Sequence, residues 1–213
     1  MNTVRVAVFA SGRGSNFRAI LHAAQAPEHP ARVVLCVTDR PGAEATHLAA
    51  EAGIAVEEVL PGTRRGAWDP EVVRRFREVL LEHEIEAVCL AGFMRLVPPE
   101  IVRQYPGRML NIHPSLLPSF PGLRAQRQAL RAGARVTGCT VHFVDDGLDT
   151  GPILLQRAVP VETDDTEETL SARILREEHR IYPHALALLA SGRVEVEHGR
   201  VRWLDPTPSG RER

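Results

Sequence analysis

The sequence predicts an α/β fold: a single domain built on a mostly parallel, twisted sheet, with helices on both faces and antiparallel strands in the C-terminal part. Two observations lead to this prediction. Short β-branched runs alternate with longer helical patterns through the first half of the chain, and parallel neighbours need a crossover that is usually a helix. After about Gly133 the alternation stops, and two strand-like runs follow with only a loop between them.

The first half of the chain is expected to supply the parallel strands. Runs rich in Val, Ile and Leu favour strands, whereas apolar residues three or four positions apart favour helices. Ligands in such sheets bind outside the carboxyl ends of the strands, so the segments that follow each strand are candidate sites. In order, the expected elements are strand 4–10, helix 16–25, strand 32–38, helix 43–52, strand 55–59, helix 70–83, strand 87–91, a short helix from Pro98 and strand 109–112.

The second half is expected to add antiparallel strands and a long helix. The strand-like runs 137–144 and 153–161 are too close in sequence for a crossover, so we expect them to be antiparallel. The helix at 166–190 opens with acidic residues that suit its amino-terminal dipole, and Gly192 caps its end. His198 and Gly199 form the turn of a last hairpin, between strands 194–197 and 201–204.

Composition excludes several classes of protein. The chain has 213 residues, 44% of them hydrophobic, and a formal net charge of -1. A net charge this close to zero does not indicate a basic surface for nucleic acid or an anionic membrane. No stretch approaches the roughly 18 apolar residues of a membrane span. Three cysteines lie far apart in apolar stretches, which favours a reducing compartment. We therefore expect a soluble, cytoplasmic protein without a signal peptide, with one domain at 1–205 and a disordered tail at 206–213.

A glycine-rich loop follows the first strand and leads into the first helix. In the segment 11–16, two glycines allow a sharp turn whose N–H groups can face an anion. Gly14, Ser15 and Asn16 are therefore candidates for binding a phosphate. The fingerprints of dinucleotide and nucleoside-triphosphate loops are absent. The alternative is an ordinary glycine turn in which Ser15 or Asn16 caps the helix.

Two polar side chains lie at the end of the strand predicted at 109–112. Asn111 and His113 are two positions apart and therefore on one face, and Pro114 stiffens the chain directly after them. Either side chain could donate to an oxyanion, the amide as a neutral donor and the imidazolium as a charged one. A lone histidine is more often a structural hydrogen-bonder, but the position at the end of a strand favours a functional role.

The loop between the two antiparallel strands is acidic. Asp145, Asp146 and Asp149 could form a solvated turn, a cation site or the source of one catalytic carboxylate. A carboxylate beside His113 would raise the pKa of the imidazole and keep it protonated. The nearby His142 is expected to be an ordinary strand residue, although it could line the same cleft.

Several of these motifs, taken in order, resemble one protein family. They are the glycine loop at 11–16, Ala-Gly-Phe-Met-Arg at 91–95, the run 110–118 followed by Phe-Pro-Gly at 120–122, the segment 138–143, and Leu-Asp-Thr-Gly-Pro-Ile at 148–153. In this combination the chain resembles the phosphoribosylglycinamide formyltransferases nearly end to end. The resemblance implies a Rossmann-like formyltransferase fold and an enzyme of purine biosynthesis. It also implies transfer of a formyl group from 10-formyltetrahydrofolate to the amine of 5-phosphoribosylglycinamide.

The resemblance assigns a catalytic trio, a phosphate loop, a contact for the glycinamide end and a folate pocket. These are, in turn, Asn111, His113 and Asp149; Gly14, Ser15 and Asn16; Glu178; and Arg65, Met94, Arg95, Leu96, Val97 and Asn111. The formyl folate acts as a co-substrate, and no metal and no covalent enzyme intermediate are expected. The implied partners are the two small molecules, without nucleic acid or membrane, and a homodimer is left open.

Related one-carbon enzymes differ in ways that bear on this interpretation. Methionyl-tRNA formyltransferase shares the Asn-x-His and Asp arrangement but typically has a C-terminal RNA-binding domain, for which the residues after 161 are too few. Formyltetrahydrofolate deformylase normally has an N-terminal regulatory domain, whereas this chain starts at its first strand. Histidines that many relatives carry after Gly122 are replaced here, so no role is expected for them. A non-catalytic phosphate-binding module is the alternative from another class, but it would not need the trio to converge.

Overall fold

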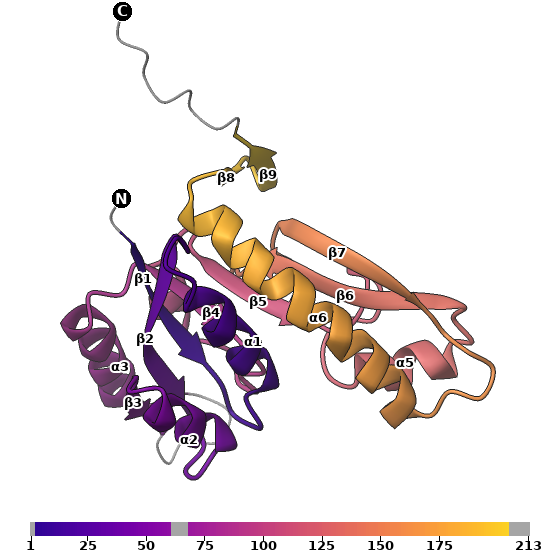
Figure 1. Ribbon diagram of the computed structural model, residues 1–213, viewed down its shortest axis with the longest axis horizontal. Coiled ribbons are helices and arrows are strands. Elements are labelled where there is room, and N and C mark those ends of the chain that lie inside the picture. The colour runs from indigo at the N-terminus through magenta and orange to yellow at the C-terminus, as the bar shows by residue number, and fades with distance from the viewer. Residues whose placement is uncertain (1–2, 61–67, 205–213) are drawn as a thin grey trace, which may run out of the picture.

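A seven-stranded sheet and a separate hairpin form the β-structure of the chain, in a computed structural model that describes residues 3–60 and 68–204. The strands are β1 (Val4–Phe9), β2 (Ala31–Thr38), β3 (Ala55–Glu58), β4 (Ala87–Leu90), β5 (Met109–His113), β6 (Val136–Phe143), β7 (Ile153–Pro160), β8 (Val194–Glu197) and β9 (Arg200–Trp203). The order in the large sheet is β3-β2-β1-β4-β5-β6-β7, and β8 pairs with β9 (Figure 1).

Helices connect the strands and cover both faces of the large sheet. In the described residues they are α1 (Ser15–Ala24), α2 (Glu44–Glu51), α3 (Pro70–Glu82), α4 (Pro99–Val102), α5 (Ala125–Arg131) and α6 (Glu167–Ala190). α3 starts where Asp69 accepts a hydrogen bond from the N–H of Glu71, a favourable cap before a proline in the first turn. α6 starts with reciprocal hydrogen bonds between Thr166 and Thr169.

The register of the sheet confirms the predicted change from parallel to antiparallel strands. β1 runs parallel to β2 and β4, β3 runs parallel to β2, and β5 runs parallel to β4. β6 is antiparallel to both of its neighbours, β5 and β7. The carboxyl ends of β1, β2, β4 and β5 therefore lie along one edge of the sheet, where ligands of such folds bind.

Alternate residues of β1 face two separate hydrophobic cores. Val6 and Val8 pack with residues of α1, α2 and α6, whereas Ala7 and Phe9 pack with residues of α3 and α4. Figure 1 shows α6 lying across one face of the sheet beside α1, with which it is in contact. The predicted arrangement of helices on both faces is therefore confirmed.

The structure adds one helix that the sequence analysis did not predict. α5 follows Arg124, whose φ of 58° is left-handed. Its buried face consists of Ala125 and Ala129, one turn apart, and this small apolar pattern does not stand out in a sequence. Other boundaries differ from the predicted ones by one residue; α1, for example, begins at Ser15.

The β8–β9 hairpin lies beyond the C-terminal end of α6 (Figure 1). His198 and Gly199 form its turn with φ values of 50° and 73°, and Gly192 follows α6 with a φ of 65°. All three match the predicted turn chemistry. The tail predicted at 206–213 lies outside the described residues, as does residue 205. Within the described ranges, no helix combines the length and the apolar composition that crossing a membrane requires.

Candidate active site

Strand β5 carries two polar side chains on one face, close to the edge where the parallel strands end. Asn111 and His113 are separated by one residue, so they lie on the same face, as predicted. In the ladder Asn111 lies opposite His142 of β6, and His113 lies opposite Thr140. Because β5 is paired on both sides, its backbone holds both groups in fixed positions.

The loop between β6 and β7 brings a carboxylate to the same place. Oδ2 of Asp149 lies 3.3 Å from Nδ1 of His113, and Oδ1 lies 3.5 Å from Nδ2 of Asn111. The backbone N–H of Gly122 donates to Oδ2 at 2.8 Å and holds the carboxylate from another side. The amide, the imidazole and the carboxylate therefore converge, although they come from two distant stretches of the chain.

The position of Asp149 depends on the backbone of its loop. Its φ of 55° is left-handed, a conformation that Asp and Asn adopt more readily than most residues. Gly151 has no room for a side chain, because an added Cβ would lie 1.9 Å from the carbonyl oxygen of Phe143. These two backbone features turn the loop so that the carboxylate of Asp149 faces β5.

The other two acidic residues of the loop line the cavity, but no contact with the trio is found for them in the described part of the chain. Asp145 accepts hydrogen bonds from the N–H of Gly147 at 3.0 Å and from the hydroxyl of Thr150 at 2.8 Å, so it closes the loop on itself. Asp146 is exposed. Of the three readings of this loop, the geometry favours a turn that presents one carboxylate. In the part of the chain that the structure describes, no three His, Cys, Asp or Glu side chains are grouped to hold a metal ion.

The surroundings of Asp149 favour the ionised carboxylate. Its side chain is only 9% exposed, and burial alone would raise its pKa. His142, the N–H of Gly122 and the charge of His113 outweigh this burial, so the pKa lies below its ordinary value. Asp149 is therefore a carboxylate near neutral pH, and as such it can only accept hydrogen bonds.

Both ring nitrogens of His113 face hydrogen-bond acceptors. Nε2 lies 2.9 Å from the carbonyl oxygen of Phe120, and Nδ1 faces Asp149. The hydroxyl of Ser115 donates to the carbonyl of Ser119 and helps to hold the turn that presents Phe120. Because neither acceptor can donate, the imidazolium form satisfies both contacts, whereas a neutral ring leaves one nitrogen without a proton to give.

His142 belongs to the site; the sequence favoured an ordinary strand residue but left open that it lines the same cleft, and it does line the cavity. Its Nδ1 lies 2.8 Å from the carbonyl oxygen of Phe143, which requires a proton on Nδ1. In the neutral ring Nε2 then accepts from Nδ2 of Asn111 at 3.1 Å. The same Nε2 is 3.7 Å from Oδ1 of Asp149. Sequence alternation could only place His142 in a strand, since its partner depends on the pairing of β5 with β6.

A large cavity opens beside these side chains. It has a volume of about 1260 Å³, and its lining includes His142 and all three members of the trio. A concave site with a few converging polar groups is typical of small-molecule binding. Arg65, one of the predicted folate contacts, lies outside the described residues. The other predicted contacts line the cavity, namely Met94, Arg95, Leu96, Val97 and Asn111.

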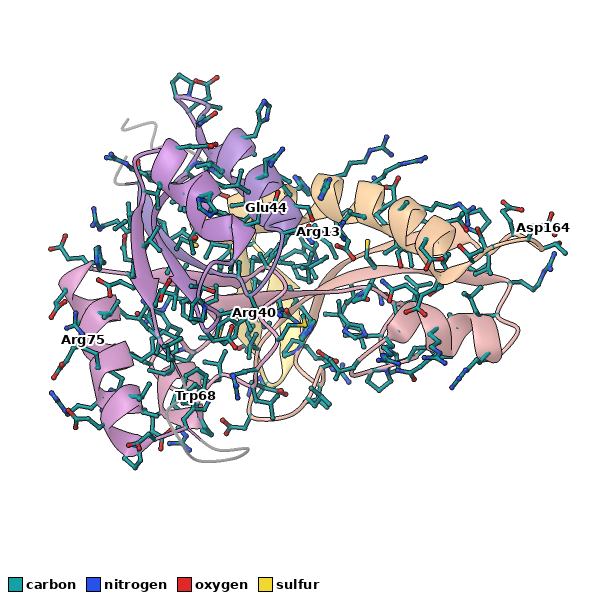
Figure 2. The ribbon with its side chains drawn as sticks, turned by 90° about the horizontal axis from the view of Figure 1, so that it is seen from below. Arg13, Arg40, Glu44, Trp68, Arg75 and Asp164 are labelled. Atoms are coloured by element: carbon teal, nitrogen blue, oxygen red, sulfur yellow. The ribbon has the colours of Figure 1, made fainter. Side chains whose placement is uncertain are left out.

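One aromatic wall of the cavity was not predicted. Trp68 lines the cavity, and its ring stacks on Phe93 with the centroids 6.4 Å apart and the planes 8° apart. Its indole N–H donates to the carbonyl of Leu96 at 2.8 Å. Trp68, labelled in Figure 2, stands just before α3 and connects that helix to the segment that follows β4.

The glycine loop leads directly into the start of α1. Gly14 has a φ of 70° and precedes Ser15, the first residue of the helix. The first N–H groups of a helix have no partner within it and favour an anion, and no acidic residue occupies this turn. Gly14, Ser15 and Asn16 are not part of the cavity lining. Their loop adjoins the cavity, because Ser11 of the same loop donates its N–H to the carbonyl of Gly92, a residue of the cavity lining, at 3.2 Å.

Glu178 joins the glycine loop rather than the trio. Its carboxylate accepts from Nδ2 of Asn16 at 2.7 Å. Burial raises the pKa of Glu178, and the hydrogen bond from Asn16 only partly offsets this. Oδ1 of Asn16 is buried and has no hydrogen-bond partner within the described residues. A buried acceptor without a partner is costly, so this corner suits a ligand that brings a donor.

The fold and the sequence together place the chain in the formyl transferase class of enzymes. The sequence model of the family described as "Formyl transferase" matches residues 4–186. The chain belongs to this family, which confirms the resemblance found in its motifs.

Similarity within the family points to one activity. The chain is 40% identical over 209 residues to the phosphoribosylglycinamide formyltransferase of Escherichia coli (strain K12), covering 95% of this chain and 94% of that protein. It is 46% identical over 206 residues to the trifunctional purine biosynthetic protein adenosine-3 of Gallus gallus, and the match spans 20% of that longer protein. The crystal structure of glycinamide ribonucleotide transformylase 1 from Symbiobacterium toebii is similar with a TM-score of 0.89 and 48% identity, covering 95% of each chain.

Proposed function

We propose that the protein transfers the formyl group of 10-formyltetrahydrofolate to the amine of 5-phosphoribosylglycinamide, and that residues 1–205 form its formyltransferase domain. The observation that carries this proposal is the convergence of Asn111, His113 and Asp149 beside the large cavity. A phosphate-binding module would use the glycine loop but would not need this convergence. The name of the relative from Escherichia coli supports the same acceptor.

The reaction begins when the neutral amine attacks the formyl carbon on N10 of the folate. A C–N bond forms, and negative charge develops on the formyl oxygen of a tetrahedral intermediate. Asn111 is suited to stabilise that charge, because one of its amide protons points to His142 and the other makes only a long contact with Asp149. One preorganised donor of this kind contributes about 2.7 to 4 kcal/mol to lowering the barrier.

His113 and Asp149 act as a charged pair beside the intermediate. The imidazolium supplies positive charge near the oxyanion, and its Nε2–H can be shared between that oxygen and the carbonyl of Phe120. The Asp149 carboxylate balances the ring and accepts, directly or through water, the proton that the attacking nitrogen loses. That proton passes to N10 as the bond between N10 and the formyl carbon breaks. Tetrahydrofolate and the formylated amine are the products.

The two substrates have separate binding partners in this proposal. Gly14, Ser15 and Asn16 offer the start of α1 to the phosphate, and Glu178 offers an acceptor to the glycinamide end. Arg65 is proposed as a folate contact on the resemblance alone. The remaining folate contacts are proposed from the cavity lining: Met94, Arg95, Leu96, Val97 and Asn111.

The proposal is tested by incubating the protein with 10-formyltetrahydrofolate, with and without 5-phosphoribosylglycinamide. Transfer produces tetrahydrofolate and the formylated amine only when both substrates are present. Release of formate without the acceptor would identify a deformylase instead, and neither product would identify a binding protein.

A matched pair of Asp-to-Asn variants tests the trio. Asp149→Asn should lower kcat by about 10²- to 10⁴-fold and still fold, because Asn tolerates the left-handed backbone. Asp164→Asn, at an exposed position outside the cavity lining, should turn over like the wild type. Near-normal turnover of Asp149→Asn would remove the carboxylate from the mechanism.

A further inference from the structure

One buried carboxylate joins the segments that follow three neighbouring strands. Asp39 directly follows β2, and its side chain is 7% exposed. Its Oδ1 accepts from the hydroxyl of Ser11, which lies just after β1, at 2.5 Å. Its Oδ2 lies 3.0 Å from Nε of Arg95, which lies after β4. Because β2, β1 and β4 are adjacent in the sheet, Asp39 reaches both other segments at the same sheet edge.

Ser11 extends this contact to the wall of the cavity. Its hydroxyl oxygen accepts from the backbone N–H of Met94 at 2.9 Å. The single hydroxyl proton is given to Asp39, which leaves a lone pair for Met94. The hydrogen bonds therefore run in one direction, from Met94 through Ser11 to Asp39, and bonds in such a chain strengthen one another.

The negative charge of Asp39 is matched by Arg95 rather than by Ser11. A neutral side chain of the same shape would accept from the Ser11 hydroxyl, whereas a buried carboxylate is costly unless it is paired. In the described part of the chain, the ion pair of Asp39 is with Arg95, whose side chain is 45% exposed and lines the cavity. The backbone on either side of Asp39 is held by a local hydrogen bond. The N–H of Arg40, a residue labelled in Figure 2, donates to the hydroxyl of Thr38 at 3.1 Å.

We propose that Asp39 is a positioning residue that ties the glycine loop to the cavity segment 92–97 and orients Arg95 toward the folate. This inference rests on the proposed function, which assigns phosphate to the loop and folate to the cavity. Through Ser11, Asp39 sets the spacing between the two binding sites. Among residues 3–60 and 68–204, none of these groups hydrogen-bonds to the trio, so their loss should act on substrate binding more than on the chemical step.

Three variants separate the two interactions of Asp39. These are its hydrogen bond with Ser11, here called the serine arm, and its ion pair with Arg95, here called the arginine arm. Asp39→Asn keeps an oxygen for the Ser11 hydroxyl but turns an NH₂ group toward Arg95, so it breaks the arginine arm alone. Ser11→Ala breaks the serine arm alone, and Asp39→Ala breaks both. The matched control is Glu44→Ala, which removes an exposed carboxylate at the start of α2, labelled in Figure 2.

The serine arm is measured by hydrogen exchange of the Met94 amide, which needs no substrate. Ser11→Ala and Asp39→Ala should exchange this amide at least about tenfold faster than the wild type. Asp39→Asn and Glu44→Ala should exchange it at the wild-type rate. Wild-type exchange in Asp39→Ala would overturn the proposal.

The arginine arm is measured by the separate KM values of the two substrates. Asp39→Asn should raise the KM for 10-formyltetrahydrofolate about tenfold, while the KM for 5-phosphoribosylglycinamide and kcat change less than about threefold. Arg95→Ala should raise the folate KM at least as much, because it removes the proposed folate contact itself, and Asp39→Asn should add little in the Arg95→Ala background, where the ion pair is already lost. Asp39→Ala should raise both KM values.

The outcomes distinguish this inference from the function on which it rests. Unchanged KM values in Asp39→Ala would overturn it even if Met94 exchanged faster, because the tie would then support the fold alone. Failure of the proposed function would instead appear as absence of transfer by the wild-type protein. Exchange of the Met94 amide could still be measured in that case.

Discussion

Nδ2 of Asn111 lies 3.1 Å from Nε2 of His142, directly across the ladder that pairs β5 with β6. The carbonyl of Phe143 holds a proton of His142 on Nδ1, so in the neutral ring Nε2 is left as an acceptor. This contact decides that the nitrogen of the amide, and not its oxygen, faces His142. A histidine outside the expected trio therefore orients one of its members.

Replacement of His142 tests this orientation. His142→Phe removes the acceptor but fills the buried position with a ring, so kcat should fall about ten- to hundredfold while the fold is retained. His142→Gln offers a side-chain oxygen to Asn111 and should recover part of the loss. Steady-state kinetics at saturating substrates, with thermal melts of both variants, make the comparison. Equal kcat values for the two variants would show that the acceptor is unimportant.

The lowered pKa of Asp149 predicts a defined dependence of stability on pH. Because the folded state favours the ionised form, its contribution is complete above the pKa of an unfolded Asp and is lost as the pH falls through the lower folded value. The free energy of unfolding should therefore fall more steeply in the wild type than in Asp149→Asn between about pH 5 and about pH 2. Urea titrations across this range measure both curves. Parallel curves would contradict the lowered pKa.

Glu178→Gln should separate stability from substrate binding. Burial raises the pKa of Glu178, so the stability of the wild type declines as the pH rises from the unfolded value through the folded one. The glutamine removes this charge and keeps an oxygen for Asn16, so above that range the variant should be at least as stable as the wild type. The KM for 5-phosphoribosylglycinamide should nevertheless rise about tenfold or more. A lower melting temperature with an unchanged KM would assign Glu178 a structural role.

Two glycines of one loop should respond differently to a methyl group. Gly14→Ala should lower the free energy of unfolding by about 1 to 3 kcal/mol, because φ is 70° and the new Cβ would lie 3.0 Å from Cα of Ala45. Gly12 has no left-handed φ and no atom within 4 Å of an added Cβ. Gly12→Ala should therefore change the free energy of unfolding by no more than about 0.5 kcal/mol.

The same pair tests the phosphate loop through kinetics. Gly12→Ala should raise the KM for 5-phosphoribosylglycinamide and leave the KM for folate unchanged, since its methyl group meets no atom of the protein within 4 Å and stands in the loop that is proposed to hold the phosphate. Equal changes in the two KM values would mean that the loop does not act on phosphate in particular. Gly12→Ala is the better probe, because Gly14→Ala also disturbs the packing of α1 on α2.

Local patterns explain why the sheet and part of the site could be predicted. Alternation of apolar runs is a property of neighbouring residues, and it identified the parallel strands and the change at β6. Asn111 and His113 could be assigned to one face because a strand repeats every two residues. Asp149 followed as one of three candidate carboxylates, but only the resemblance to a family singled it out.

The sequence by itself determined the kinds of elements, their order and the turns at His198 and Gly192, because periodicity and turn chemistry act over a few residues. Only the tertiary structure decided that His142 meets Asn111, that Ser11 meets Asp39, and that Trp68 closes one wall of the cavity. These contacts join residues that are tens of positions apart. They depend on the order and register of strands across the sheet, which no local pattern encodes.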